Sequence, residues 1–157
     1  MRRTVSLAFS LIALASPLAA QSHPDFSGKW VLDPKSVEGP MAPTGLTLTA
    51  TQDAKTLKTE SAATSQYGDQ KSALTVNLDG TPSKNTVETP NGSIELSSIG
   101  TWDGSTFVIK TTATVNGEQL LQTDHWNLEP GGKTLHLQRD IAFGGQNFSM
   151  KMVLAKQ

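Results

Sequence analysis

Six turn-forming dipeptides punctuate the chain and constrain its fold more than any other feature. They are Asp79-Gly80, Asn91-Gly92, Asp103-Gly104, Asn116-Gly117, Gly131-Gly132 and Gly144-Gly145. Asn, Asp and Gly tolerate the positive φ of type I′ turns, and the segments between them are runs of strand length rich in Thr, Val, Ile and Leu. The pattern predicts consecutive antiparallel hairpins. No long run has helical spacing, and we expect only a single helical turn around Pro34 to Val37.

The turns also predict which residues face each other, because a slip of one residue would turn every side chain to the other face. Counting outwards from Asn116-Gly117 and Gly131-Gly132 predicts the pairs Phe107–Trp126, Ile109–Asp124, Trp126–Leu137 and Asp124–Arg139. Counting from Gly144-Gly145 adds Arg139–Met150 and Leu137–Met152. These residues share one mainly apolar face, and the other face carries Thr, Ser, Lys, Gln and Glu, as a solvated surface should.

A sheet of about ten strands with one apolar face is expected to curl closed. The apolar face continues in the earlier strands through Leu46, Leu48, Leu57, Leu74, Val76 and Leu78. Closure removes exposed edges and buries this face against itself. We therefore predict an all-β fold, an antiparallel up-and-down meander barrel of about 8–10 strands. A β-sandwich is the alternative, although it usually needs longer connections. Residues 38–45 are the most irregular stretch and are expected to form a loop over one end.

The N-terminus has the order of a secretory signal peptide. "MRR" is followed by a short apolar stretch and then by "SPLAAQS", which predicts a signal peptide over residues 1–20 and a single domain over residues 21–157. A retained N-terminal anchor is the alternative. The domain should be soluble, in the periplasm or secreted, with no transmembrane segment after cleavage. The chain has no Cys, so an exported domain would form without disulfides.

The charge of the expected domain argues against nucleic acid as a partner. Without Arg2 and Arg3, 11 basic residues face 14 acidic ones, a net charge of about −3, and no basic cluster is present. We expect no nucleic-acid binding.

Asp124 and Arg139 are the strongest candidate pair, since the register places both charges inside the barrel. One interpretation is architectural: a buried ion pair that specifies register and closes one end. The other is functional: Arg139 keeps donors free for a ligand carboxylate or phosphate, with Asp124, Gln122 and Thr111 around it.

Thioethers and aromatic rings on the same inner face suit an adaptable apolar pocket, although plain core filling is the alternative. Small inward residues at Ser98, Gly100, Thr111 and Ala113 favour a cavity, because a filled barrel needs bulk there. The predicted ligand-binding residues are Phe107, Ile109, Thr111, Gln122, Asp124, Trp126, Leu137, Arg139, Met150 and Met152.

Catalytic and metal-binding signals are weak. No Gly-x-Ser-x-Gly, Walker or His-Glu-x-x-His motif occurs, and no inward His could act as a base, so we do not expect an enzyme or a cofactor. His125 and His136 fall on the outer face, where a surface metal site is conceivable, but no metal-ligand spacing supports it. We expect no metal site there.

Two motifs carry a family resemblance. "DFSGKWVLDPKS", residues 25–36, and "WNLEPGGKTLHL", residues 126–137, resemble small secreted bacterial proteins of lipocalin-like (calycin) type, a mostly uncharacterised group. Gly28-x-Trp30 is similar to the Gly-x-Trp signature of true lipocalins, whose Trp lies at the barrel base beneath a late-strand Arg. Gly28 and Trp30 would then be structural, with Arg139 as that Arg and Thr123-Asp124 similar to the Thr-Asp of the middle motif.

The chain departs from the lipocalin pattern at several points: His125 replaces an expected Tyr, disulfides are absent, and no C-terminal helix follows. The strand count also resembles fatty-acid-binding barrels, in which interior Arg residues hold a carboxylate. The two resemblances therefore imply different roles for Arg139.

These observations together predict an exported, non-catalytic barrel that binds a small apolar or amphipathic ligand in its interior. The alternative is a filled barrel that acts through its surface and loops as a protein-interaction or inhibitor module. A central cavity would favour the first, and a packed core the second.

Overall fold

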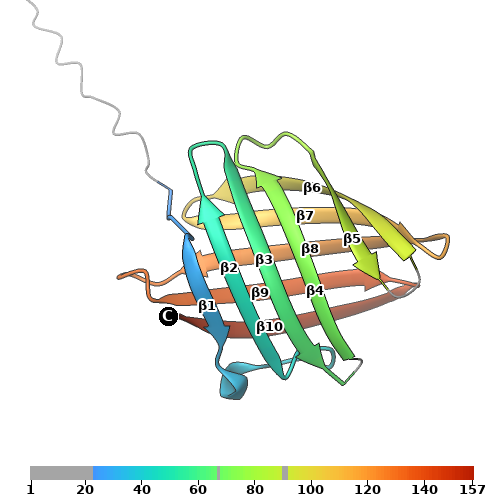
Figure 1. Ribbon diagram of the computed structural model, residues 1–157, viewed down its shortest axis with the longest axis horizontal. Coiled ribbons are helices and arrows are strands. Elements are labelled where there is room, and N and C mark those ends of the chain that lie inside the picture. Colours follow the sequence, from blue (N-terminus) through green and yellow to red (C-terminus); the bar gives the residue numbers. More distant parts are fainter. Residues whose placement is uncertain (1–22, 67, 90–91) are drawn as a thin grey trace, which may run out of the picture.

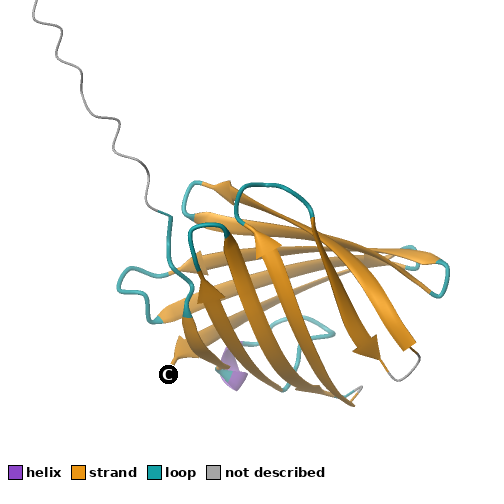
Figure 2. Ribbon diagram, turned by 45° about the horizontal axis from the view of Figure 1, so that its top comes forward, coloured by secondary structure: helices purple, strands orange, loops and turns teal. Residues whose placement is uncertain are grey.

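The computed structural model describes residues 23–66, 68–89 and 92–157. The predicted signal peptide, residues 1–20, lies outside them, as does Asn91 of one predicted turn. The elements are β1 (Gly28–Leu32), a single 3₁₀ turn η1 (Pro34–Ser36), β2 (Gly45–Gln52), β3 (Thr56–Ser65), β4 (Gly68–Asn77), β5 (Ser83–Thr89), β6 (Gly92–Asp103), β7 (Thr106–Val115), β8 (Glu118–Leu128), β9 (Thr134–Phe143) and β10 (Gln146–Lys156). Figure 2 shows how completely strands dominate the fold.

The strands form one antiparallel sheet that curls into a nearly closed barrel. Its order is β4-β3-β2-β1-β10-β9-β8-β7-β6-β5, so strands that follow each other in sequence are paired, except β4 and β5 at the two ends of the order, and β10 pairs with β1. In Figure 1, β1 to β5 cross in front of β6 to β10 at a steep angle. The predicted all-β up-and-down meander barrel is confirmed, and the ten strands of the described residues agree with the expected 8–10.

The predicted register is also confirmed. All six pairs derived from the turns occur, including Ile109 with Asp124, Asp124 with Arg139, and Arg139 with Met150. The other turns differ in detail. Asp79-Gly80 lies between β4 and β5, which share no ladder. Thr89 pairs with Gly92, so Gly92 belongs to β6, a shift of the pairing by two residues. Asp103 pairs with Thr106, so the β6–β7 turn consists of Gly104 and Ser105, and Asp103 belongs to the strand. This change keeps every side chain on its expected face, because it moves the pairing by two residues.

One seam interrupts the hydrogen-bonded wall, between β4 and β5. These strands lie side by side but share no ladder. Asn85 of β5 bridges the seam with its side-chain amide. Its Oδ1 accepts from the backbone N–H of Thr75 at 2.7 Å, and its Nδ2 donates to the Thr75 carbonyl at 2.9 Å. One side chain thus satisfies the two backbone groups that the sheet edge would otherwise leave unpaired.

A dense aromatic core fills one end of the barrel, which we call the packed end. Its fully buried side chains include Phe26, Trp30, Phe107, Leu57, Val76, Leu135 and Leu154. Phe26 comes from the segment before β1, which folds across this end. The Trp30 Nε1 donates to the Phe26 carbonyl at 2.9 Å, and the Gln52 side chain accepts from the Phe26 N–H at 3.1 Å. Phe26 therefore closes the packed end of the barrel.

Candidate functional site: an interior cavity opposite the packed end

The other end of the barrel contains a cavity of about 270 Å³, which we call the open end. Its walls come from the connection before β2, from β2 to β5, and from β9 and β10. The lining residues are Pro43, Leu46, Ser61, Ala63, Asp69, Gln70, Lys71, Ser72, Val87, Glu88, Thr89, Arg139 and Met152. This volume corresponds to the space of about nine water molecules in the liquid, enough for a small ligand.

Small inward side chains create this space. Along β3, Leu57 and Thr59 are buried towards the packed end, whereas Ser61 and Ala63 point inwards at the open end. Ser72 of β4 faces Ser61, and their hydroxyls hydrogen-bond at 2.8 Å. The two serines are cross-strand neighbours in the same wall, and their short side chains leave interior space that larger apolar residues would fill.

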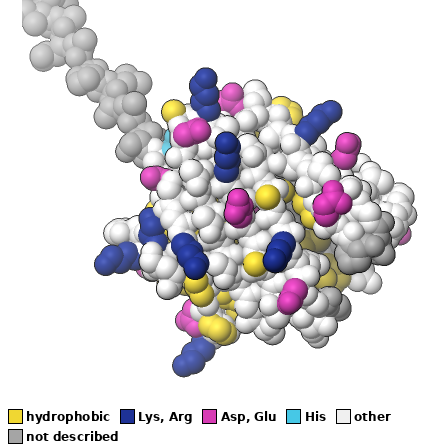
Figure 3. Space-filling model, viewed as in Figure 1, with side chains coloured by type: hydrophobic (Ala, Val, Ile, Leu, Met, Phe, Trp, Pro, Cys, Tyr) yellow, Lys and Arg dark blue, Asp and Glu magenta, His cyan; other side chains and the backbone are white. Residues whose placement is uncertain are grey.

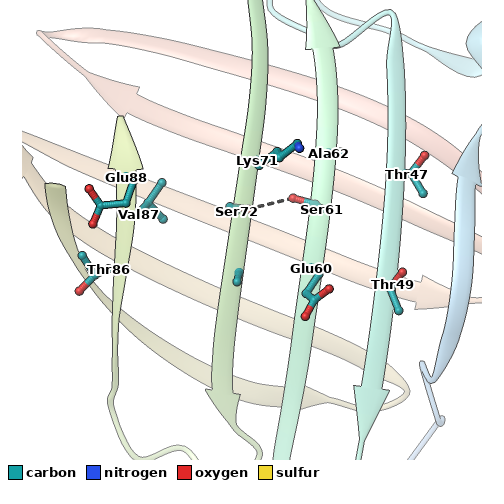
Figure 4. Close-up of a pocket in the computed structure, with 11 residues that line it drawn as sticks. Thr47, Thr49, Glu60, Ser61, Ala62, Lys71, Ser72, Thr86, Val87 and Glu88 are labelled. Carbon is teal, nitrogen blue, oxygen red and sulfur yellow. Dashed lines mark hydrogen bonds between the residues drawn. The ribbon is translucent and has the colours of Figure 1, made fainter. Parts of the chain in front are cut away.

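The cavity adjoins the seam between β4 and β5. A groove on the outer surface of β2 to β5 shares five lining residues with it: Ser61, Lys71, Ser72, Val87 and Glu88. Figure 4 shows Val87 and Glu88 on β5 and Lys71 and Ser72 on β4, on the two sides of the seam. On the same face in Figure 3, charges of both signs are scattered and apolar side chains are visible between them. The cavity and the outer groove therefore lie against the same stretch of β3 to β5.

Asp124 and Arg139 form a bidentate ion pair at the inner wall. Arg139 Nε donates to Asp124 Oδ1 at 2.6 Å, and Arg139 Nη2 donates to Oδ2 at 2.9 Å. The side chain of Asp124 is 6% exposed and that of Arg139 is 32% exposed. Gln122 Nε2 donates to Asp124 Oδ2 at 2.9 Å. Arg139 thus shields Asp124 and turns its own outer edge to the cavity.

The charge of Arg139 is firmly held. Burial by itself lowers the pKa of the guanidinium, but the charge of Asp124 and its hydrogen bonds outweigh this effect and raise the pKa above its ordinary value. The Nη1 group and one N–H of Nη2 have no acceptor among the described residues. These donors are available to a molecule in the cavity.

The predicted ligand-binding residues divide between two places. Arg139 and Met152 line the cavity, with Asp124 and Gln122 behind them. Thr111 is buried and bonds to Ser98 at 2.9 Å. The other five lie in the packed core: Phe107, Ile109, Trp126, Leu137 and Met150. Their contact with a ligand stays a prediction, whereas the geometry of the cavity favours other residues.

The expected space around Gly100 is filled, because side chains from other strands occupy it. A Cβ at Gly100 would clash with the ring of Phe107 and lie 2.8 Å from Val76 Cγ1. Small size at this position therefore permits close packing, and the inference of a cavity there was wrong.

Sequence reasoning did not assign the cavity residues of β3 to β5 to the ligand site. The inner face is easier to follow in the later strands, where apolar residues mark it. The available signal was the alternation of small residues, Ser61 and Ala63 on β3 with Ser72 on β4. In a half-polar strand such residues resemble a solvated face, so alternation alone did not separate the inside from the outside.

Gly28 and Trp30 have structural positions at the packed end. Gly28 has φ of +142°, and a Cβ there would clash with the Lys156 side chain. The ammonium of Lys156 lies 5.2 Å from the centre of the Trp30 ring. The cation over Trp30 is therefore Lys156, whereas Arg139 is engaged with Asp124. The lipocalin-based pairing of Trp30 with Arg139 was wrong, because β10 and not β9 lies beside β1.

His125 and His136 lie on the outer face, as expected, in a shallow hollow with Thr106, Asn127 and Gln138. His136 Nε2 lies 2.6 Å from Glu129 Oε1. Within residues 23–66, 68–89 and 92–157, no three His, Cys, Asp or Glu side chains gather in a way that could hold a metal ion. In the same residues, no helix has the length and apolar character needed to cross a membrane.

Comparison with known proteins adds support for the fold. No protein-family model matches the chain, and no curated protein sequence matches it. Among solved structures, it is similar to secretory abundant heat soluble protein 4 from Ramazzottius varieornatus, with a TM-score of 0.54 and 11% identity over 88% of this chain and 99% of that one. The zebrafish ileal bile acid-binding protein, solved with cholic acid, has a TM-score of 0.49 and 16% identity over 84% and 98% of the two chains. At 11% identity, the likeness to the Ramazzottius varieornatus protein is one of fold alone.

Proposed function

We propose that this protein is a non-catalytic binding barrel that holds a small amphipathic molecule in its open end. The observation that carries this proposal is an interior cavity at one end of the barrel, while the opposite end is packed solid. A barrel filled throughout would favour the alternative, a protein-interaction module, but only one end is filled.

The lining of the cavity supports an amphipathic ligand. Leu46, Val87 and Met152 supply apolar surface, and Arg139 offers free N–H donors on the inner wall. Such a mixture of apolar contact and a few placed polar groups is typical of small-molecule sites. Two of the hydroxyls in the cavity lining, on Ser61 and Ser72, bond to each other, which supports a binding role over a catalytic one.

We further propose that the protein acts outside the cytoplasm, after removal of residues 1–20. The order of basic, apolar and small residues at the N-terminus supports export, as does the resemblance to small secreted bacterial lipocalin-like proteins. Detection of a mature protein that begins at Gln21 in the extracytoplasmic fraction would support this placement, and an intact N-terminus in the cytoplasm would contradict it.

Native mass spectrometry with extraction of bound molecules tests the binding proposal. Ala63 faces the cavity from β3, so Ala63→Leu fills space without removing a hydrogen bond. Ala155→Leu, at an exposed position of β10, is the matched control. We expect a co-purifying molecule, or uptake of decanamide, in the natural protein and in the control. We expect Ala63→Leu to bind decanamide at least about tenfold more weakly, because the added side chain occupies the space of the ligand. Equal uptake by all three proteins would place binding elsewhere.

A further inference from the structure

The ion pair that Arg139 forms with Asp124 restricts the chemical class of the ligand further than the proposed function, on which this inference rests. We infer that the cavity selects an uncharged hydrogen-bond acceptor, such as an amide or ester group, over a carboxylate. A lone inward Arg would favour an anion. Here the cation is already paired with Asp124, so the local charge is balanced before any ligand arrives.

The geometry leaves Arg139 as a donor but not as a free charge. Both Asp124 oxygens are engaged, with Oδ1 bonded to Nε and Oδ2 bonded to Nη2 and to Gln122 Nε2. The remaining N–H groups of Arg139 are available to an acceptor in the cavity, which Arg139 lines. A ligand carboxylate at that position would share the guanidinium with the nearly buried Asp124 carboxylate, and two like charges around one cation repel strongly where water is scarce.

The other charged groups around the cavity do not restore a positive field. The lining contributes Asp69, Lys71, Glu88 and Arg139. Together with Asp124, the site has three carboxylates and two cations, and the connected outer groove adds the carboxylate of Glu60. An approaching anion therefore meets a neutral to negative entrance, whereas an uncharged ligand pays no such electrostatic penalty.

A matched ligand pair tests this selection directly. We would measure the binding of decanamide and decanoate to the purified full chain by isothermal titration calorimetry at pH 7. The two ligands share one alkyl chain and differ in head-group charge. We expect decanamide to bind about tenfold tighter. Decanoate affinity should rise as the pH falls to about 4, where an alkyl carboxylate becomes protonated, and decanamide affinity should change less.

The substitution Asp124→Asn should reverse the preference, because it leaves the charge of Arg139 uncompensated while keeping the shape of the side chain. Asp103→Asn, in the exposed end of β6 at the packed end, changes the net charge of the chain equally and serves as the control. It should retain the preference for decanamide. If Asp124→Asn does not fold, the pH comparison on the natural protein still decides.

Tighter or equal binding of decanoate by the natural protein at pH 7 would overturn the selection while leaving the binding barrel intact. Failure of both ligands to bind would overturn the proposed function itself and, with it, this inference. A preference for decanamide that reverses in Asp124→Asn supports both.

Discussion

The two ends of this barrel are built from the same strands but have opposite interiors. At the packed end, Phe26, Trp30 and Phe107 are each fully buried and their neighbours interlock. At the open end, the inner face of the same sheet carries Ser61, Ala63 and other small residues, and a cavity remains. The β3–β4 and β7–β8 ladders continue without interruption along their strands. The sheet therefore sets the shape of the wall, and the side-chain volumes set what the wall encloses.

This contrast separates stability from binding. Burial of large apolar side chains at the packed end supplies the main driving force for folding. The open end buries fewer large apolar side chains. Its polar side chains mostly bond to one another, as Ser61 does to Ser72 and Arg139 does to Asp124. Substitutions at the two ends should accordingly differ in what they damage.

The largest effect should come from the packed end. Phe107→Ala removes a fully buried ring that contacts Gly100 and should lower the free energy of unfolding by about 4 kcal/mol. Val87→Ala, in the cavity wall, should cost about 1 kcal/mol or less, because that side chain is only half-buried. Urea unfolding of both variants measures the difference. Similar losses would mean that the two ends are equally important for stability.

Arg139→Ala tests the boundary between the two ends. It leaves the nearly buried Asp124 carboxylate without its cation, so we expect a loss of about 3 kcal/mol at pH 7. Part of this loss should be recovered in the double variant Asp124→Asn with Arg139→Ala, which removes the stranded charge. A loss below about 1 kcal/mol for Arg139→Ala would show that solvent screens the pair.

Asn85→Ala sharpens the comparison at the seam. It removes both hydrogen bonds to Thr75 and should cost about 1–2 kcal/mol. Hydrogen exchange at the Thr75 amide should accelerate, because β4 then has no partner there. Thr86→Ala, at the exposed neighbouring position, is the control and should leave that exchange unchanged. Unaltered protection of Thr75 in Asn85→Ala would show that the side-chain bridge does not hold the seam.

The smallest expected effect is on the pKa of Glu129, which lies on the outer surface, away from the packed end and the cavity. The hydrogen bond from His136, with a further one from Thr134, lowers the pKa of the Glu129 carboxyl below its ordinary value. A carboxylate with a lowered pKa stabilises the fold above its unfolded pKa, and this contribution is lost as the pH falls through the folded pKa. In His136→Ala, an NMR titration should show the Glu129 pKa moving up towards normal, while the cavity residues stay unperturbed. No upward movement would contradict this assignment.

Turn chemistry and alternation were enough to predict the later half of the barrel. The Asn116-Gly117 and Gly144-Gly145 turns determine the register because positive φ is tolerated only by a few residues, and the count then places Asp124 opposite Arg139. These are local rules, each acting within one hairpin. Arg139 and Met152 were therefore identified as inward-facing before the cavity that they line was known.

Which part of the interior is filled depended on residues that are far apart in sequence. Phe107 and Val76 fill the space beside Gly100, while Ser61 and Ser72 leave space. The segment containing Phe26 closes one end, and the cavity at the other end adjoins the seam. The sequence by itself determined strand order, register and the inward ion pair, since turn geometry and alternation act locally. Only the tertiary structure decided where the cavity lies, because enclosed volume is the sum of side chains brought together by closure of the whole barrel.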